Sequence, residues 1–267
     1  MIKYFMIRLF REKTFYLALL VGISLSLAYV VVDVLPYTDL RFMHNPYNSW
    51  IGTFTASVFA SLFYMLLPIY AVIATSGMYL GDKQSGYLNT ILVRGKKRTY
   101  FKDLYIVNFI TAGMCYMIPA AINVYFCFLL LPDQKIDMII NQTHTVSLYG
   151  HDTLFPLLYY NHPFIHVCMY IGLGFLVSGI FASIALAMSF YLKKVFFVWI
   201  SAFVMNFLYQ TVLIVLIPET PVRFWPLNII QQVGSSADIF STVVVIASGF
   251  LISLAGYLWG VKRYAIL

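Results

Sequence analysis

Long apolar stretches separated by short polar segments run through almost the whole chain. A helix of about 20 residues crosses a hydrocarbon layer about 30 Å thick, and these stretches reach that length. The pattern predicts six membrane-spanning helices, at residues 15–35, 54–80, 104–131, 164–192, 195–217 and 239–260. We therefore expect an all-α membrane protein in which residues 15–267 form a single transmembrane domain.

Composition leads to the same class of protein. Hydrophobic residues make up 61% of the 267 residues and charged residues only 10%, whereas soluble domains average about 25% charged residues. In so apolar a chain, the net charge of +7 favours basic segments beside an anionic lipid bilayer over a nucleic-acid site. The composition excludes a soluble globular domain, and nucleic acid is not expected as a partner.

The positions of lysine and arginine predict the orientation, because positive residues next to membrane spans are retained on the cytoplasmic side. Six spans place both termini on one side of the membrane. Of the 17 lysines and arginines, only Arg41, Lys135 and Arg223 fall on the other side. We therefore predict that both termini are cytoplasmic.

Residues 1–14 are predicted to form an amphipathic helix that lies along the inner leaflet. Ile2, Phe5, Met6 and Leu9 repeat at the spacing of one helical face, and charged residues occupy the other face. A helix of this kind buries its apolar face in the lipid interface without crossing it.

Two long segments are predicted on the external side. Residues 132–163 form a polar and aromatic loop, and loops longer than about 12–15 residues are often functional or disordered. Residues 218–237 contain three prolines together with aromatic and apolar residues. Such a composition suits a re-entrant segment before the sixth span, with its aromatic residues at the membrane interface.

A pair of histidines near the fourth span raises the question of a metal site. His162 and His166 are four residues apart and could place two imidazoles on one helical face. The spacing alone is a weak signal, so we favour two interfacial histidines and predict no metal.

Charged side chains are missing from the central part of every span. A transporter driven by protons or sodium normally keeps such residues inside its helical bundle, so ion coupling is not expected. Asn206 and Gln210 are neutral, lie four residues apart and share one face of the fifth span. They could line a pathway or hydrogen-bond a neighbouring helix, and helix packing is the more frequent use.

Motifs of familiar enzyme chemistry are also missing. The sequence contains no Gly-x4-Gly-Lys-Ser/Thr phosphate loop, no His-Glu-x-x-His and no Gly-x-Ser-x-Gly. We predict no catalytic residue and no enzyme activity in this chain. Any uphill transport would draw its energy from another protein.

The most informative segment is the loop between the second and third spans, residues 81–102. Asp82 can cap a short helix, and a stop at Gly95 precedes a basic cluster. The apolar face of that helix would consist of Tyr87, Leu88, Ile91 and Leu92. A basic loop held on anionic lipid is the alternative, but the apolar face favours a helix that fits a groove on a partner.

This loop, together with the six spans, resembles the permease subunits of ABC-2 type transporters. The loop of that family typically has an acidic residue, a Gly-x-Leu/Ile element, paired aliphatic residues, an arginine and a lysine. The matching positions here are Asp82, Gly86, Leu88, Ile91, Leu92, Arg98 and Lys102. Two departures are visible: Asp82 stands where glutamate is usual, and Arg94-Gly95 where a proline is common.

The resemblance implies a half-transporter in a bacterial cell membrane. Two permease chains, identical or different, would pair, and each would dock on one of two ABC ATPase subunits that bind ATP and Mg. This chain itself would need no cofactor. The residues implied in ATPase coupling are Asp82, Gly86, Tyr87, Leu88, Ile91, Leu92, Arg94 and Arg98.

The uncharged spans favour a hydrophobic or amphipathic substrate over a sugar or an ion. We expect export of a peptide, with lipid or drug export by the same architecture as the alternative. A different class is a membrane scaffold or sensor that does not transport, and it would need neither a coupling-like loop nor an ATPase. A membrane lipid enzyme would need polar groups converging near one interface, and the external histidines and carboxylates have no recognisable spacing.

Overall fold

The computed structural model describes residues 1–38, 44–53, 57–75, 77–93, 97–134, 136, 153–232 and 238–264. These residues form helices and loops, with no strand among them. Six of the described helices are long and apolar enough to cross a membrane, which supports a multi-pass membrane protein. These candidate spans are Lys13–Val34, Val58–Gln84, Lys97–Leu130, Pro163–Met188, Val195–Leu216 and Ile239–Arg263.

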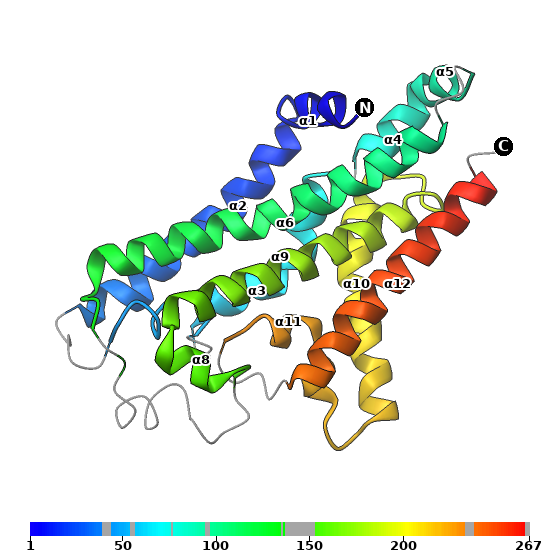
Figure 1. Ribbon diagram of the computed structural model, residues 1–267. Coiled ribbons are helices and arrows are strands. Elements are labelled where there is room, and N and C mark those ends of the chain that lie inside the picture. Colours follow the sequence, from blue (N-terminus) through cyan, green and yellow to red (C-terminus); the bar gives the residue numbers. More distant parts are fainter. Residues whose placement is uncertain are drawn as a thin grey trace.

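The first three spans come from the N-terminal half of the chain (Figure 1). Helix α1 (Ile2–Leu9) leads into α2, and α2 ends in a π-helical turn and a 3-10 turn. The second span consists of two helices, α3 and α4, and the short α5 precedes the long α6. The bounds are α2 Lys13–Tyr29, η1 Val30–Val34, η2 Leu35–Tyr37, α3 Val58–Ile73, α4 Gly77–Gln84, α5 Tyr87–Val93 and α6 Lys97–Leu130.

The remaining spans are α9, α10 and α12, with short helices at the loops. Helix α8 comes directly before α9, while η3 and α11 lie between α10 and α12. The bounds are α8 Pro156–Asn161, α9 Pro163–Met188, α10 Val195–Leu216, η3 Pro221–Phe224, α11 Pro226–Ile229 and α12 Ile239–Tyr264.

The predicted spans agree with these helices to within a few residues, except at α6. That helix begins at Lys97 rather than at residue 104. The apolar pattern stops where the basic residues begin, but lysine and arginine are good helix formers and extend the helix beyond its apolar part. The first turns of α6 therefore carry Lys97, Arg98 and Lys102.

Helix α9 is the centre of the bundle and packs against α6, α12, α10 and α3. Small residues permit this packing. A Cβ added at Gly174 of α9 would lie 2.0 Å from Cε1 of Tyr116, and one added at Gly113 of α6 would lie 2.4 Å from Cδ2 of Phe175. Each helix thus offers a glycine to an aromatic ring of the other, so the two backbones approach closely.

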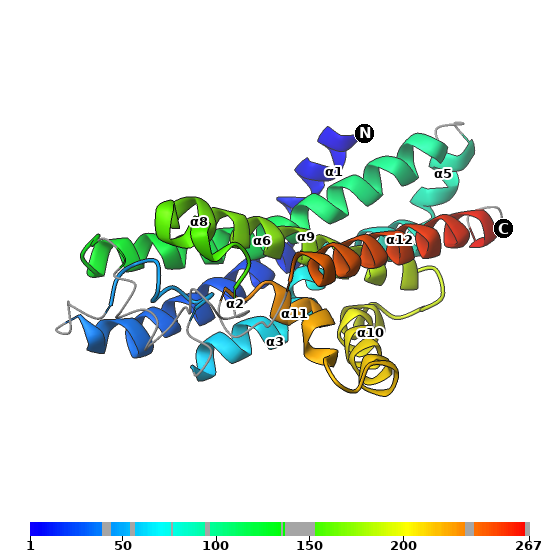
Figure 2. The same cartoon turned by 60° about the horizontal axis from the view of Figure 1, so that its bottom comes forward.

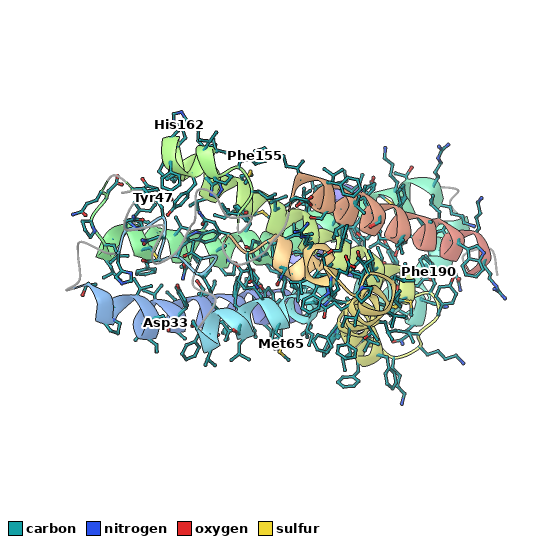
Figure 3. The ribbon with its side chains drawn as sticks, turned by 90° about the horizontal axis from the view of Figure 1, so that it is seen from below. Asp33, Tyr47, Met65, Phe155, His162 and Phe190 are labelled. Atoms are coloured by element: carbon teal, nitrogen blue, oxygen red, sulfur yellow. The ribbon has the colours of Figure 1, made fainter. Side chains whose placement is uncertain are left out.

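The bundle has two distinct ends (Figures 1 and 2). Helices α1 and α5 and the last turn of α12 lie at one end, which we call the termini end. Helices α8 and α11 lie towards the other, which we call the α8 end. Figure 3 shows Asp33, Tyr47 and His162 at the α8 end and Phe190 towards the termini end.

Candidate functional site

The loop expected to contact a partner forms two short helices, α4 and α5, at the termini end. Gly86 connects them with a φ of +75°, a left-handed conformation that glycine adopts without steric cost. The Ser85 N–H still donates to the Gly81 carbonyl oxygen at 2.9 Å, so α4 continues up to this glycine. Asp82 consequently lies in the last turn of α4 and does not cap α5, contrary to the sequence-based expectation.

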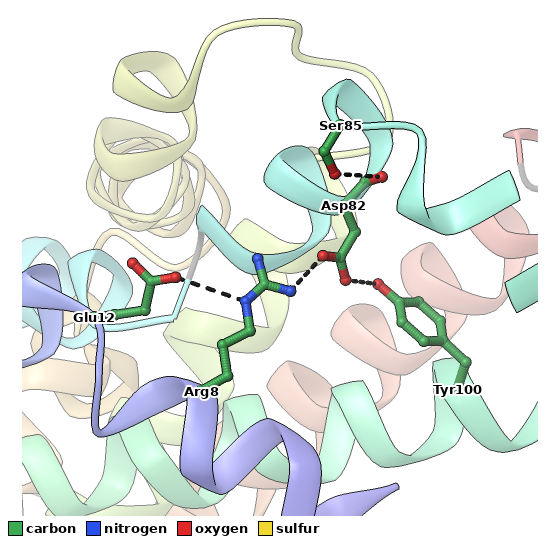
Figure 4. A network of polar contacts seen from close by, with 5 residues as sticks. All are labelled: Arg8, Glu12, Asp82, Ser85 and Tyr100. Atoms are coloured by element: carbon green, nitrogen blue, oxygen red, sulfur yellow. Dashed lines mark hydrogen bonds and ion pairs between the residues drawn. The ribbon is translucent and has the colours of Figure 1, made fainter. Parts of the chain in front are cut away.

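Asp82 is 2% exposed and joins three elements of the termini end (Figure 4). Its Oδ1 forms an ion pair with Arg8 of α1, and its Oδ2 accepts a hydrogen bond from the Tyr100 hydroxyl of α6 at 2.5 Å. A buried carboxylate needs such partners, because an unpaired one is strongly destabilising. The network therefore ties α1, α4 and α6 to one another.

Arg8 is the partly exposed member of the Arg8–Asp82–Tyr100 network, with 23% of its side chain accessible. Its Nε also lies 3.6 Å from the Glu12 carboxylate. Partial burial acts to lower the pKa of Arg8, but the hydrogen bond and the negative charge of Asp82 outweigh burial and raise that pKa above its ordinary value. The guanidinium is therefore charged at neutral pH.

Helix α1 packs on the protein through part of its apolar face. Phe5 and Leu9 are fully buried, and the ring of Phe5 lies 5.3 Å from that of Tyr100. Ile2 of the same predicted face remains exposed, as does Phe10 directly after the helix. The apolar face of α1, which the sequence predicts to contact lipid, thus packs partly against the bundle and is partly exposed.

The residues implied in coupling face in different directions. Tyr87 is 37% exposed, with its ring 6.0 Å from that of Tyr4 of α1, whereas Leu88 is 5% exposed and faces the interior of this chain. Arg98 is exposed on the first turn of α6. Ile91 and Leu92 lie in α5, but their side chains, like the whole of Arg94, lie outside the described residues.

The two neutral polar residues of the fifth span are not equivalent. Asn206 is buried and lines a cavity of about 100 Å³ between α10 and α12. Its Oδ1 accepts no hydrogen bond from any described residue. Gln210 is half-buried and does not belong to the lining. The structure therefore brings Asn206, without Gln210, to this cavity.

The cavity lies where α10 and α12 both pack on α9 and leave a crevice between them. Aliphatic and aromatic side chains form most of its surface, so it suits an apolar group. Its lining comprises Val177, Ile180, Phe181, Ile184, Met205, Asn206, Tyr209, Pro226, Val245, Ser248, Gly249 and Ile252.

The α8 end contains a buried network that the sequence analysis missed. The indole N–H of Trp50 donates to Oε1 of Gln232, and Nε2 of Gln232 donates to Nδ1 of His166 at 2.9 Å. Because the Leu154 carbonyl oxygen can only accept, the 2.7 Å contact with Nε2 of His166 places the imidazole proton on Nε2. All three side chains are fully buried and uncharged in this arrangement.

Asn123 of α6 extends this neutral network. Its Oδ1 accepts from the Ile51 N–H at 2.8 Å, and its Nδ2 donates to the Ser26 carbonyl oxygen of α2 at 3.1 Å. The Gln232 N–H donates to the Gly52 carbonyl oxygen at 2.8 Å. Segments 50–52 and 229–232 are thereby fixed to α2, α6 and α9.

The two histidines of the possible metal pair lie in different environments. His166 uses both ring nitrogens within the network, while His162 is exposed before α9. Among the described residues, no group of three or more His, Cys, Asp or Glu could hold a metal ion.

Three comparisons with known proteins gave no match: no family model, curated protein or solved structure matches the chain.

Proposed function

We propose that this chain is the permease subunit of an ATP-driven ABC-2 type exporter in a bacterial cell membrane, with both termini cytoplasmic. The observation that carries the proposal is the α4–α5 unit, a compact pair of short helices in which α4 ends the second candidate span and α5 precedes the third. Force applied to α5 would reach both spans directly, because α4 continues the second and α6 is the third.

The Asp82 network explains how such a force would spread. Asp82 of α4 holds Arg8 of α1 and Tyr100 of α6, so a displacement of α4 moves all three elements. Leu88, buried in this chain, anchors α5 to the bundle. The described part of the surface offered to the ATPase would then be exposed Tyr87 and Arg98.

The apolar crevice between α10 and α12 supports the substrate class that we propose. Its lining suits a hydrophobic or amphipathic molecule better than a polar one. We propose a peptide as the substrate, with a lipid or a drug as the alternative. The complex would contain two permease chains, identical or different, and two ATPase subunits that bind ATP and Mg, and this chain would contribute no catalytic group.

The test is purification of the tagged chain from its native membrane in mild detergent, with identification of the proteins that accompany it. We expect a stoichiometric ATPase with the wild-type chain and its loss with Tyr87→Asp. The matched control is Leu157→Asp, which places the same charge on an exposed position of α8 at the opposite end. Absence of an ATPase from the wild-type complex, even after cross-linking through residues 81–102, would refute the proposal.

A further inference from the structure

A groove runs between the start of α6 and the end of α12 at the termini end, with a volume of about 620 Å³. Two contacts join the helices that line it. The Tyr257 hydroxyl of α12 donates to the Phe101 carbonyl oxygen of α6 at 2.8 Å, and the hydroxyls of Tyr105 and Ser253 lie 3.1 Å apart. The two helices that line the groove are thus joined to each other.

Three cations line the mouth of this groove: Lys97, Arg98 and Lys102 of α6. Among the described acidic residues, none forms an ion pair with them. Asp103, their nearest neighbour in sequence, is occupied instead by the N-terminal ammonium group at 3.3 Å. Like charges on adjacent turns of one helix repel each other, so an anion in the groove would relieve this repulsion.

The rest of the groove is apolar. Leu254 and Leu258 of α12 and Ile106 of α6 line it further from the end of the bundle. From Lys97 to Tyr105 the helix rises about 12 Å, which gives room for a charged head and the first part of an acyl chain. A small inorganic anion would use the cations and leave the apolar wall unoccupied.

We propose that this groove binds an anionic phospholipid. Its phosphate lies at Lys97, Arg98 and Lys102, where the guanidinium can form two parallel hydrogen bonds to the phosphate. Its acyl chain follows Leu254 and Leu258. Lipid binding here needs no ATPase and can be measured on the isolated chain, although Arg98 also belongs to the surface proposed for the ATPase.

The experiment is native mass spectrometry of the purified chain titrated with phosphatidylglycerol or phosphatidylcholine that carry the same acyl chains. We expect wild-type protein to retain phosphatidylglycerol at least about tenfold more tightly, because basic residues near an anionic headgroup each strengthen binding. Arg98→Gln/Lys102→Gln should lose on the order of 10- to 30-fold in that affinity. Leu258→Trp, which fills the groove and keeps every charge, should also release the lipid.

The matched control is Lys193→Gln/Lys194→Gln, which removes two charges from the loop between α9 and α10, outside the groove. Its affinity for phosphatidylglycerol should stay within about twofold of wild type. Equal binding of the two lipids, or equal losses in the two double variants, would overturn the proposal. Displacement of the lipid by millimolar inorganic phosphate would show a simple anion site and would also overturn it.

Discussion

The two ends of the bundle are held together by different chemistry. At the termini end the central contact is charged, between Asp82 and an arginine that is 23% exposed. At the α8 end the contacts of Trp50, Gln232 and His166 are neutral and fully buried. A satisfied neutral network in a low-dielectric interior is costly to open, whereas a partly exposed arginine can exchange its partner for water or another anion. The comparison indicates a fixed α8 end and a termini end able to respond.

The largest effect is expected from Gln232→Leu at the α8 end. The substitution leaves the Trp50 indole N–H and Nδ1 of His166 buried without partners, and each such group costs about 1–3 kcal/mol. We predict a loss of about 3 kcal/mol in the free energy of unfolding, measured by denaturant titration in detergent micelles. Gln231→Leu, next to it in sequence, is the control and should change little. Equal losses in the two variants would show that the hydrogen bonds of the Gln232 side chain do not stabilise the fold.

A smaller loss is expected from Asp82→Asn at the termini end. Arg8 then loses its carboxylate but can still reach water, so we predict a loss of about 2 kcal/mol. In an Arg8→Gln background the same change should cost less than half as much, because the pair is already broken. Glu12→Gln, which removes an exposed carboxylate from the same arginine, should cost under about 0.5 kcal/mol. If the losses in the free energy of unfolding caused by Arg8→Gln and Asp82→Asn simply add, the two side chains are not paired.

Asp238→Ala tests the start of α12, and its expected loss of stability is smaller than that of Gln232→Leu or Asp82→Asn. Oδ1 of Asp238 accepts from the Ser241 N–H at 2.8 Å, and hydrogen bonds from Ser241 lower the pKa of Asp238 below its ordinary value. A carboxyl whose pKa is lowered on folding stabilises the protein above its unfolded pKa. We predict a loss of about 1 kcal/mol at neutral pH, and this loss should diminish as the pH falls below about 4 and then through the lowered pKa of Asp238. A loss that persists in acid would rule out the ionised cap.

The smallest expected effect is the response to salt. It compares the termini end with the α8 end in the wild-type protein, without any substitution. Ions screen partly exposed charges much more than buried neutral hydrogen bonds. Raising the ionic strength should therefore speed amide hydrogen exchange in α1 and leave residues 50–53 unchanged. Equal acceleration in both segments would show that the two ends do not differ in kind.

The sequence predicts the spans well because the length of an apolar stretch is a local property. It also predicts a short helix within residues 81–102, since a helix stop and an apolar repeat lie within a few residues of each other, but the helix begins after Gly86 and is not capped by Asp82. The start of α6 was wrong by several residues, because apolarity ends before helix propensity does.

The contacts that organise the two ends could not be predicted in the same way. Arg8 and Asp82 are 74 residues apart, and Trp50 and Gln232 are 182 residues apart. Local spacing says which residues share a helical face but not which faces meet. For the same reason the apolar face of α5 was predicted, while the inward position of Leu88 within it was not.

The most direct test of the account is hydrogen–deuterium exchange of the complex isolated with its native partner, compared between ADP and a non-hydrolysable ATP analogue. If α4 and α5 receive force from an ATPase and α1 follows through Arg8, exchange should change in residues 2–9 and 77–93. Residues 50–53 and 229–232, fixed by the neutral network, should show no change. A nucleotide response that is absent from residues 77–93, or equal at both ends, would contradict the account.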